Sequence, residues 1–80
     1  NAEDFEIMRF VELKDARVYP QQNGIATEIG DIVLTDSEIR GFTRAKTDET
    51  RTMITLRNGN ILITATSYEE IKSKLIAEDK

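Results

Sequence analysis

The sequence predicts an α+β domain that is mainly β: a small, strongly bent antiparallel sheet or SH3-like partial barrel of four to five strands with a C-terminal helix. Three observations lead to this fold class. Short stretches of β-branched and aromatic residues recur along the chain, an Asn-Gly pair joins two of them, and a helix-capping pattern follows the last. A run of strands closed by one helix is typical of small α+β units.

The length and composition indicate one small globular domain. Eighty residues suffice for a single core, which we assign to residues 3–80; Asn1 and Ala2 are interpreted as a tag remnant or the start of an excised fragment. The longest apolar runs hold about three residues, far fewer than the ~20 of a transmembrane helix, and no leader is visible. We therefore expect a cytoplasmic protein.

The first third of the chain is the least regular. Residues 5–13 mix aromatic and β-branched residues and predict a strand, with a bulge near Arg9 where the alternation loses phase. Residues 15–30 hold the single proline and two glycines and predict an irregular connection, with at most a short strand at 17–19. A ligand-binding loop is the alternative interpretation of this connection. Residues 31–34 predict a short buried strand.

A single helical turn is predicted next. Thr35 and Glu38 have the T-x-x-E spacing of a capping box, and Gly41 suits the end of the turn. Residues 42–46 then predict another strand, and residues 47–50 a polar turn.

The clearest motif is a hairpin about Asn58-Gly59. A two-residue type I′ loop predicts the pairs Arg57–Asn60, Leu56–Ile61, Ile54–Ile63 and Thr52–Ala65. For Phe42 to share a face with Ile54, the preceding loop must have an odd length or contain a bulge around Asp48.

A helix is predicted after the hairpin. Ser67 and Glu70 have the S-x-x-E spacing of a second capping box. Tyr68, Ile71 and Leu75 then fall on one stripe, which must lie on the sheet because so short a helix is not stable alone.

The residue types present restrict the chemistry. Histidine and cysteine are absent, which removes Ser-His and Cys-His dyads, thiolate chemistry and nearly every zinc site. Carboxylate pairs for acid–base or metal chemistry exist, but helix caps and a turn also account for them: Asp36/Glu38, Asp48/Glu49 and Glu69/Glu70. We expect no enzyme, with no catalytic residue, metal or cofactor.

The charge is distributed unevenly. The chain carries a net charge of −4, which disfavours nonspecific binding of nucleic acid or anionic membrane. Residues 40–57 nevertheless carry a local charge of +3. The residues of this candidate basic strip are Arg40, Arg44, Lys46, Arg51 and Arg57. The strip indicates either a surface for phosphates or an acidic partner, or solvated strand positions whose charges prevent aggregation.

One resemblance to a known family can be stated. The pieces "IVLTDSEIRGF", "TMITLRNGNILIT" and "SYEEIKSKL" follow one another between residues 32 and 76, with Ile39 and Phe42 at the place of an I-x-x-I-like pair. In this order they resemble the small FlbD-like family of flagellar and swarming motility proteins, although the 15–30 connection and the acidic N-terminal segment depart from that pattern. The resemblance implies a compact, partly barrel-like bacterial or phage protein without enzymatic activity, and it adds no site residues.

The sequence therefore favours a noncatalytic protein–protein interaction or regulatory module. Its partner is expected to be another protein, or a copy of the same chain, that pairs with an exposed sheet edge. The alternative is a nucleic-acid-binding domain that uses the basic strip in residues 40–57. No membrane partner is expected.

Overall fold

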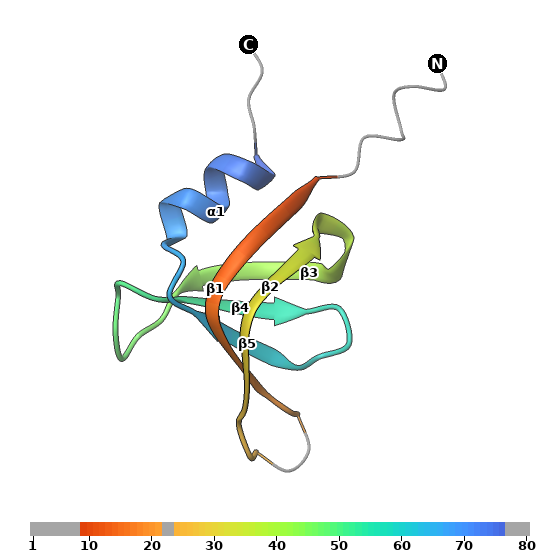
Figure 1. Ribbon diagram of the computed structural model, residues 1–80, viewed down its shortest axis with the longest axis vertical. Coiled ribbons are helices and arrows are strands. Elements are labelled where there is room, and N and C mark those ends of the chain that lie inside the picture. The colour runs from red at the N-terminus through yellow and green to blue at the C-terminus, as the bar shows by residue number, and fades with distance from the viewer. Residues whose placement is uncertain (1–8, 22–23, 77–80) are drawn as a thin grey trace.

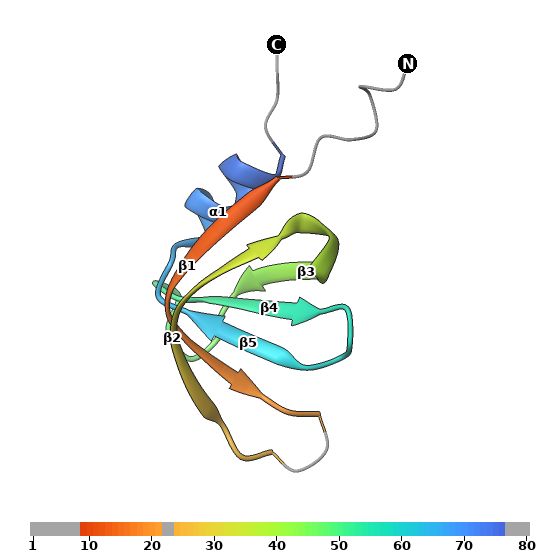
Figure 2. The same ribbon diagram turned by 45° about the vertical axis from the view of Figure 1, so that its right-hand side comes forward.

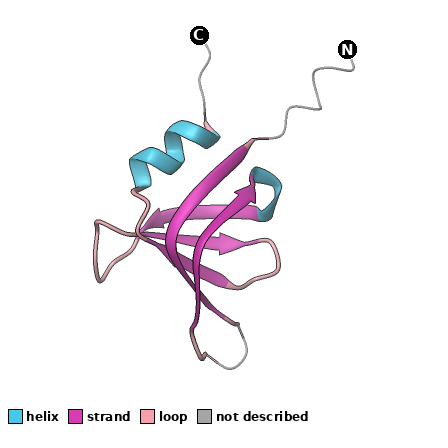
Figure 3. Ribbon diagram, in the orientation of Figure 1, coloured by secondary structure: helices cyan, strands magenta, loops and turns pink. Residues whose placement is uncertain are grey.

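The computed structural model describes residues 9–21 and 24–76 (Figure 1). The elements in chain order are β1 (Phe10–Tyr19), β2 (Thr27–Thr35), the 3-10 turn η2 (Asp36–Glu38), β3 (Ile39–Arg44), β4 (Thr52–Leu56), β5 (Ile61–Thr64) and α1 (Tyr68–Leu75). Within the described residues, five strands form one antiparallel sheet in the order β2-β1-β5-β4-β3, and one α-helix comes last (Figure 3). The predicted mainly-β α+β class is confirmed.

The predicted strong bending of the sheet, or its partial closure into an SH3-like barrel, is wrong. β2 and β3 are the two edge strands, and the sheet is neither closed nor strongly curled as a partial barrel would be (Figure 2). The physical reason lies in η2, which joins β2 to β3 by one short turn without pairing them. In the part of the chain that the structure describes, the sheet therefore keeps two unpaired edges.

β1 and β2 are much longer than predicted. Together they fill most of the 15–30 stretch that was expected to be irregular, and the connection between them spans only residues 20–26. The irregular residues are bulges inside strands: Asp15 has φ +53° and Gly30 has φ +87°, next to shifts in the β1–β2 register. The bulge expected near Arg9 therefore lies several residues later. Residues 5–8 of the predicted first strand are outside the described residues.

The β4–β5 hairpin forms about Asn58 and Gly59 as predicted, but with another turn. The Gly59 N–H donates to the Leu56 carbonyl, and the Leu56 N–H donates to the Asn60 carbonyl, both at 2.9 Å. Gly59 has φ +95°, so this is a three-residue loop with glycine in the left-handed position, in place of a two-residue type I′ loop. The Asn-Gly pair suits both loops because both need a positive φ at the glycine.

The longer loop shifts the hairpin register by one residue. The predicted pairs Arg57–Asn60, Leu56–Ile61, Ile54–Ile63 and Thr52–Ala65 are wrong, and the structure has Thr55–Ile61, Ile54–Leu62, Met53–Ile63 and Thr52–Thr64. Ile54 and Leu62 consequently share the buried face, and Ile63 points to the opposite one.

The pairing of β3 with β4 follows the predicted parity. Phe42 lies opposite Ile54, and the loop between the strands, residues 45–51, has the odd length required. β3 begins earlier than predicted, at Ile39, because Gly41 lies beside a register shift inside the strand and does not end the helical turn. In that turn Thr35 makes no capping bond to the backbone; its hydroxyl lies 3.0 Å from that of Ser37.

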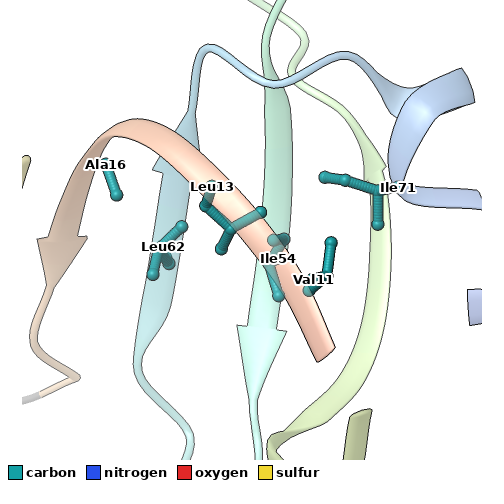
Figure 4. Packing of buried hydrophobic residues seen from close by; sticks show 6 residues of the cluster. All are labelled: Val11, Leu13, Ala16, Ile54, Leu62 and Ile71. Carbon is teal, nitrogen blue, oxygen red and sulfur yellow. The ribbon is translucent and has the colours of Figure 1, made fainter. Parts of the chain in front are cut away.

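The core lies between β1 and the inner face of β4 and β5. Figure 4 shows β1 passing across these two strands, with side chains from all three meeting one from α1. The cluster consists of Val11, Leu13, Ala16, Ile54, Leu62 and Ile71. Each of these residues is almost completely removed from solvent, so they supply the main stabilising burial.

Three buried threonines form hydrogen bonds beside the bulge of β1 at Asp15. The Lys14 N–H donates to Thr66 Oγ1 at 2.9 Å, and Thr64 Oγ1 donates to the Lys14 carbonyl at 2.6 Å. Thr52 Oγ1 donates to the Thr66 carbonyl at 2.7 Å. The bonds of Thr64 and Thr66 satisfy the backbone of Lys14 where β1 is irregular, and the bond of Thr52 holds Thr66. No buried side-chain polar atom in the described part of the chain lacks a partner.

The helix α1 begins as predicted. Ser67 Oγ accepts the Glu70 N–H at 3.1 Å, and Ile71 of the predicted stripe is fully buried against the sheet. Within residues 9–21 and 24–76, no helix has both the length and the apolar character needed to cross a bilayer.

Replacing Ser67 by alanine is expected to lower the free energy of unfolding by about 1 kcal/mol, because the Glu70 N–H loses its acceptor. Urea denaturation measures the change. Ser73→Ala is a suitable control, since the Ser73 hydroxyl only donates to the Glu70 carbonyl and caps no helix end. An unchanged urea midpoint for Ser67→Ala would show that another residue caps α1.

Candidate functional site

The structure divides the predicted basic strip into two groups. Arg44 lies opposite Thr52, and the Ala45 N–H donates to the Arg51 carbonyl, so one group gathers where β3 ends and β4 begins. Its members are Arg44, Lys46 and Arg51. The other group, Arg40 and Arg57, lies at the opposite ends of the same two strands, where Ile39 pairs with Leu56. The five cations therefore do not form one continuous strip.

Three of the five cations are engaged within the protein. Arg44 forms an ion pair with Glu69 and lies over the ring of Tyr68, with its guanidinium carbon 4.4 Å from the ring centroid. Arg51 Nη2 is 3.1 Å from an Asp15 carboxylate oxygen. Arg57 Nε donates to the Ser37 carbonyl at 2.7 Å. Arg40 and Lys46 are exposed.

The ion pair of Arg44 stabilises the docking of α1. The hydrogen bond from Arg44 lowers the pKa of Glu69 below its ordinary value, and a backbone hydrogen bond adds to this effect. A carboxyl with a lowered pKa stabilises the fold above its ordinary pKa, and the stabilisation is lost as the pH falls through the lowered value. This pair therefore strengthens the attachment of the helix at neutral pH and not in acid.

Replacing Arg44 by methionine is expected to raise the pKa of Glu69 towards its ordinary value, because the largest cause of the lowering is removed. A titration of side-chain carboxyl signals by NMR measures the pKa. Arg40→Met, at an exposed position of the same strand, should leave it unchanged. An identical Glu69 pKa in wild type and Arg44→Met would contradict the pairing.

A polar pocket of about 280 Å³ lies near the bulge of β1 at Asp15. Asp15, Asp48 and Arg51 line it together with Arg17. Arg51 bridges the two aspartates, with Nε 3.8 Å from Asp48 and Nη2 3.1 Å from Asp15. Hydrogen bonds from Thr50 lower the pKa of Asp48. These charges are thus matched among themselves, and the described residues contain no acidic cluster that could hold a metal ion.

The remaining pairs of acidic residues lie in the 3-10 turn and in the first turn of the helix. Asp36 and Glu38 lie in η2, and Glu69 and Glu70 lie in the first turn of α1, where acids stabilise a helix. These positions suit the expected role of the carboxylates as turn and cap residues.

A second pocket of about 310 Å³ lies on the sheet face opposite the core. Met53, Ile63 and Ala45 are its apolar lining, and Thr43 and Lys46 also line it. Met53 and Ile63 are paired across β4 and β5 and are half-buried.

The edge strand β2 is the most exposed apolar element. Val33 is 56% exposed and Ile29 is 42% exposed, and Phe10 of the neighbouring strand is 59% exposed. Ile32 and Leu34 alternate with the exposed residues and pack against the core. The prediction of a buried strand at residues 31–34 is therefore only half right, because alternate side chains face the solvent.

β2 has fewer of the features that protect sheet edges: its bulge at Gly30 leaves residues 31–35 as a regular edge. Its nine residues, TEIGDIVLT, include no lysine, arginine or proline, the residues that commonly block edge pairing. The other edge, β3, is shorter, carries Arg40 and Arg44, and has a bulge next to Gly41. The two edges thus differ, and β2 is the one suited to pairing.

No family model, curated protein or solved structure matches this chain. The resemblance to FlbD-like proteins rests on the sequence motifs alone and stays a prediction.

Proposed function

We propose that the protein is a noncatalytic interaction or regulatory module that binds a partner strand along the free edge of β2. The observation that carries this proposal is an edge strand without lysine, arginine or proline whose regular part exposes the apolar side chain of Val33. The resemblance to FlbD-like proteins supports a bacterial or phage origin, and the cytoplasm is the location that we expect.

The β2 edge supplies both backbone hydrogen bonds and selective side chains for binding an extended partner segment. Its outward backbone N–H and C=O groups give hydrogen bonds that any extended segment can accept and donate. In the regular part of the strand, beyond the bulge at Gly30, Ile32 and Leu34 favour apolar residues at alternate positions of the partner, and Val33 favours an apolar residue on the opposite face. Asp31 lies on the same face as Val33 and favours a hydroxyl or basic residue opposite it.

A selection of displayed random decapeptides on the immobilised protein tests this proposal. We expect enriched peptides to have alternating apolar residues and to lose at least about tenfold in affinity, or about 1.4 kcal/mol, when Val33 is replaced by lysine. Thr43→Lys is the matched control, because Thr43 is exposed on the other edge strand and its replacement should leave the affinity unchanged. Peptides that bind the two variants equally, or no enrichment at all, would overturn the proposal.

The nucleic-acid alternative leads to a separate prediction. Because the basic residues form two groups and three of them have partners in the protein, we expect no binding of a mixed-sequence DNA or RNA oligomer at tens of micromolar protein and about 50 mM salt. Fluorescence anisotropy measures binding. Micromolar affinity that falls steeply with salt, and is abolished by Arg44→Glu with Arg57→Glu, would reverse the preference between the two functions.

A further inference from the structure

We propose that the strand that pairs with β2 is β2 of a second copy of this chain, antiparallel, with the two-fold axis passing through Val33. This inference rests on the proposed function, because it names the partner for the same edge. The resulting dimer would join two five-stranded sheets into one ten-stranded sheet.

The geometry of β2 limits the pairing to a short segment. Gly30, with φ +87°, marks a bulge in β2, so the regular part of the strand is residues 31–35. A symmetric antiparallel junction keeps each face continuous only if opposed residues point to the same side. Since side chains alternate along a strand, the axis must pass through a residue and not between two residues.

Only one of the resulting registers suits the side chains. An axis at Asp31 places two carboxylates directly opposite each other, and like charges in this arrangement are destabilising. An axis at Ile32 places Asp31 opposite Val33, where the carboxylate faces an apolar side chain. An axis at Leu34 leaves only residues 33–35 of β2 within the pair.

An axis at Val33 places chemically compatible side chains opposite each other. Val33 lies opposite its own copy, and Ile32 lies opposite Leu34 of the copy. Asp31 lies opposite Thr35 of the copy, whose hydroxyl can donate to the carboxylate. Every opposed pair in this register is therefore either apolar with apolar or acceptor with donor.

The same register also extends the hydrophobic core across the junction. Leu13 pairs with Ile32, and Val11 pairs with Leu34, and each β1 member of these pairs is almost completely buried. Ile32 and Leu34 remain half-buried at the edge of the single chain. In the dimer, Ile32 of one copy lies opposite Leu34 of the other. Each line of paired residues across the junction then holds four apolar side chains, two from each copy, and more of their surface is removed from water.

The charges around Asp31 are compatible with this junction. Lys14 Nζ lies 3.7 Å from one carboxylate oxygen of Asp31, and the Asp15 N–H donates to the other at 3.1 Å. The carboxylate therefore has its charge partner within its own chain. A hydroxyl from the second copy adds a donor on the open side without leaving an unpaired charge.

Disulfide trapping tests the register, because the natural chain has no cysteine and one introduced thiol is unique. Opposed strand residues have Cα atoms about 4.5–5.5 Å apart, which suits a disulfide. Val33→Cys is therefore expected to form a disulfide dimer at least about tenfold faster than Asp31→Cys or Thr35→Cys, whose copies would lie about 14 Å apart along the strands. An equimolar mixture of Asp31→Cys and Thr35→Cys should form the mixed dimer instead.

Sedimentation of the wild-type protein completes the test. We expect a concentration-dependent dimer that Val33→Lys converts to a monomer, whereas Thr43→Lys on β3 remains a dimer. A wild-type monomer up to about 1 mM, a weak limit for association, or equal trapping of all three cysteine variants, would overturn the inference. Peptide selection distinguishes the proposed function from self-pairing. If the protein is monomeric but selected peptides bind it and lose affinity on Val33→Lys, the proposed function stands and the dimer is excluded.

Discussion

Replacing Ile54 by alanine is expected to lower the free energy of unfolding by about 2–5 kcal/mol, because a large buried side chain is lost and the core closes the cavity only in part. Ile54 is 0% exposed and lies on the interior strand β4, paired with Phe42 on one side and with Leu62 on the other. An 80-residue domain has a total stability of only about 4–12 kcal/mol. The variant is therefore expected to lose a large share of its stability.

Urea denaturation followed by circular dichroism measures this change, with Ile25→Ala as the matched control. Ile25 is the same residue type but is 70% exposed, so its replacement should change the free energy of unfolding by less than about 0.5 kcal/mol. Equal losses for the two variants would contradict the core assigned to β1, β4 and β5.

The parts of the fold that the sequence predicts well are those with local signals. The S-x-x-E spacing at Ser67 begins α1 because one hydroxyl serves one backbone N–H three residues later. The parity between Phe42 and Ile54 holds because a slip of one residue would move a whole apolar face into solvent. Both signals need only a few neighbouring residues.

The predicted hairpin register is wrong because the local pattern is ambiguous. Two loop lengths place a positive φ at Gly59, and the sequence pattern does not distinguish them by itself. Apolar residues at 61, 62 and 63 are consecutive, so either Leu62 or Ile63 can oppose Ile54. The choice depends on the core contributed by β1, which lies far away in the sequence.

The long strands β1 and β2 were missed because Asp15 and Gly30 are typical turn residues. In the structure they are bulges, and the backbone of the neighbouring Lys14 bonds to Thr64 and Thr66. Those bonds join residues about fifty positions apart, which no local pattern reveals. The same bonds satisfy the hydroxyl groups of the threonines, so these residues can be buried.

The candidate site depends even more on tertiary contacts. Strand parity groups Arg44 with Lys46 and Arg51 with Arg57, but it does not show that Glu69 and Asp15 reach two of these cations. The exposed edge at β2 had a signal in the sequence, the alternation of Ile29, Asp31 and Val33 without any lysine. The three consecutive apolar residues Ile32 to Leu34 outweigh this signal, because such a run is typical of a buried strand.

Replacing Gly59 by valine is expected to lower the free energy of unfolding by about 1–3 kcal/mol, the usual cost of holding a residue in an unfavourable backbone conformation. Gly59 has φ +95°, which a β-branched residue resists. An added Cβ would also lie 2.5 Å from Gln21 Oε1, although that flexible side chain can move away. Gly59→Asn separates the two causes, since asparagine brings the same Cβ but tolerates a left-handed backbone better. In urea denaturation we expect a clearly smaller loss for asparagine than for valine; equal losses would assign the effect to the contact with Gln21, and an unchanged midpoint for Gly59→Val would show that the turn does not need a positive φ.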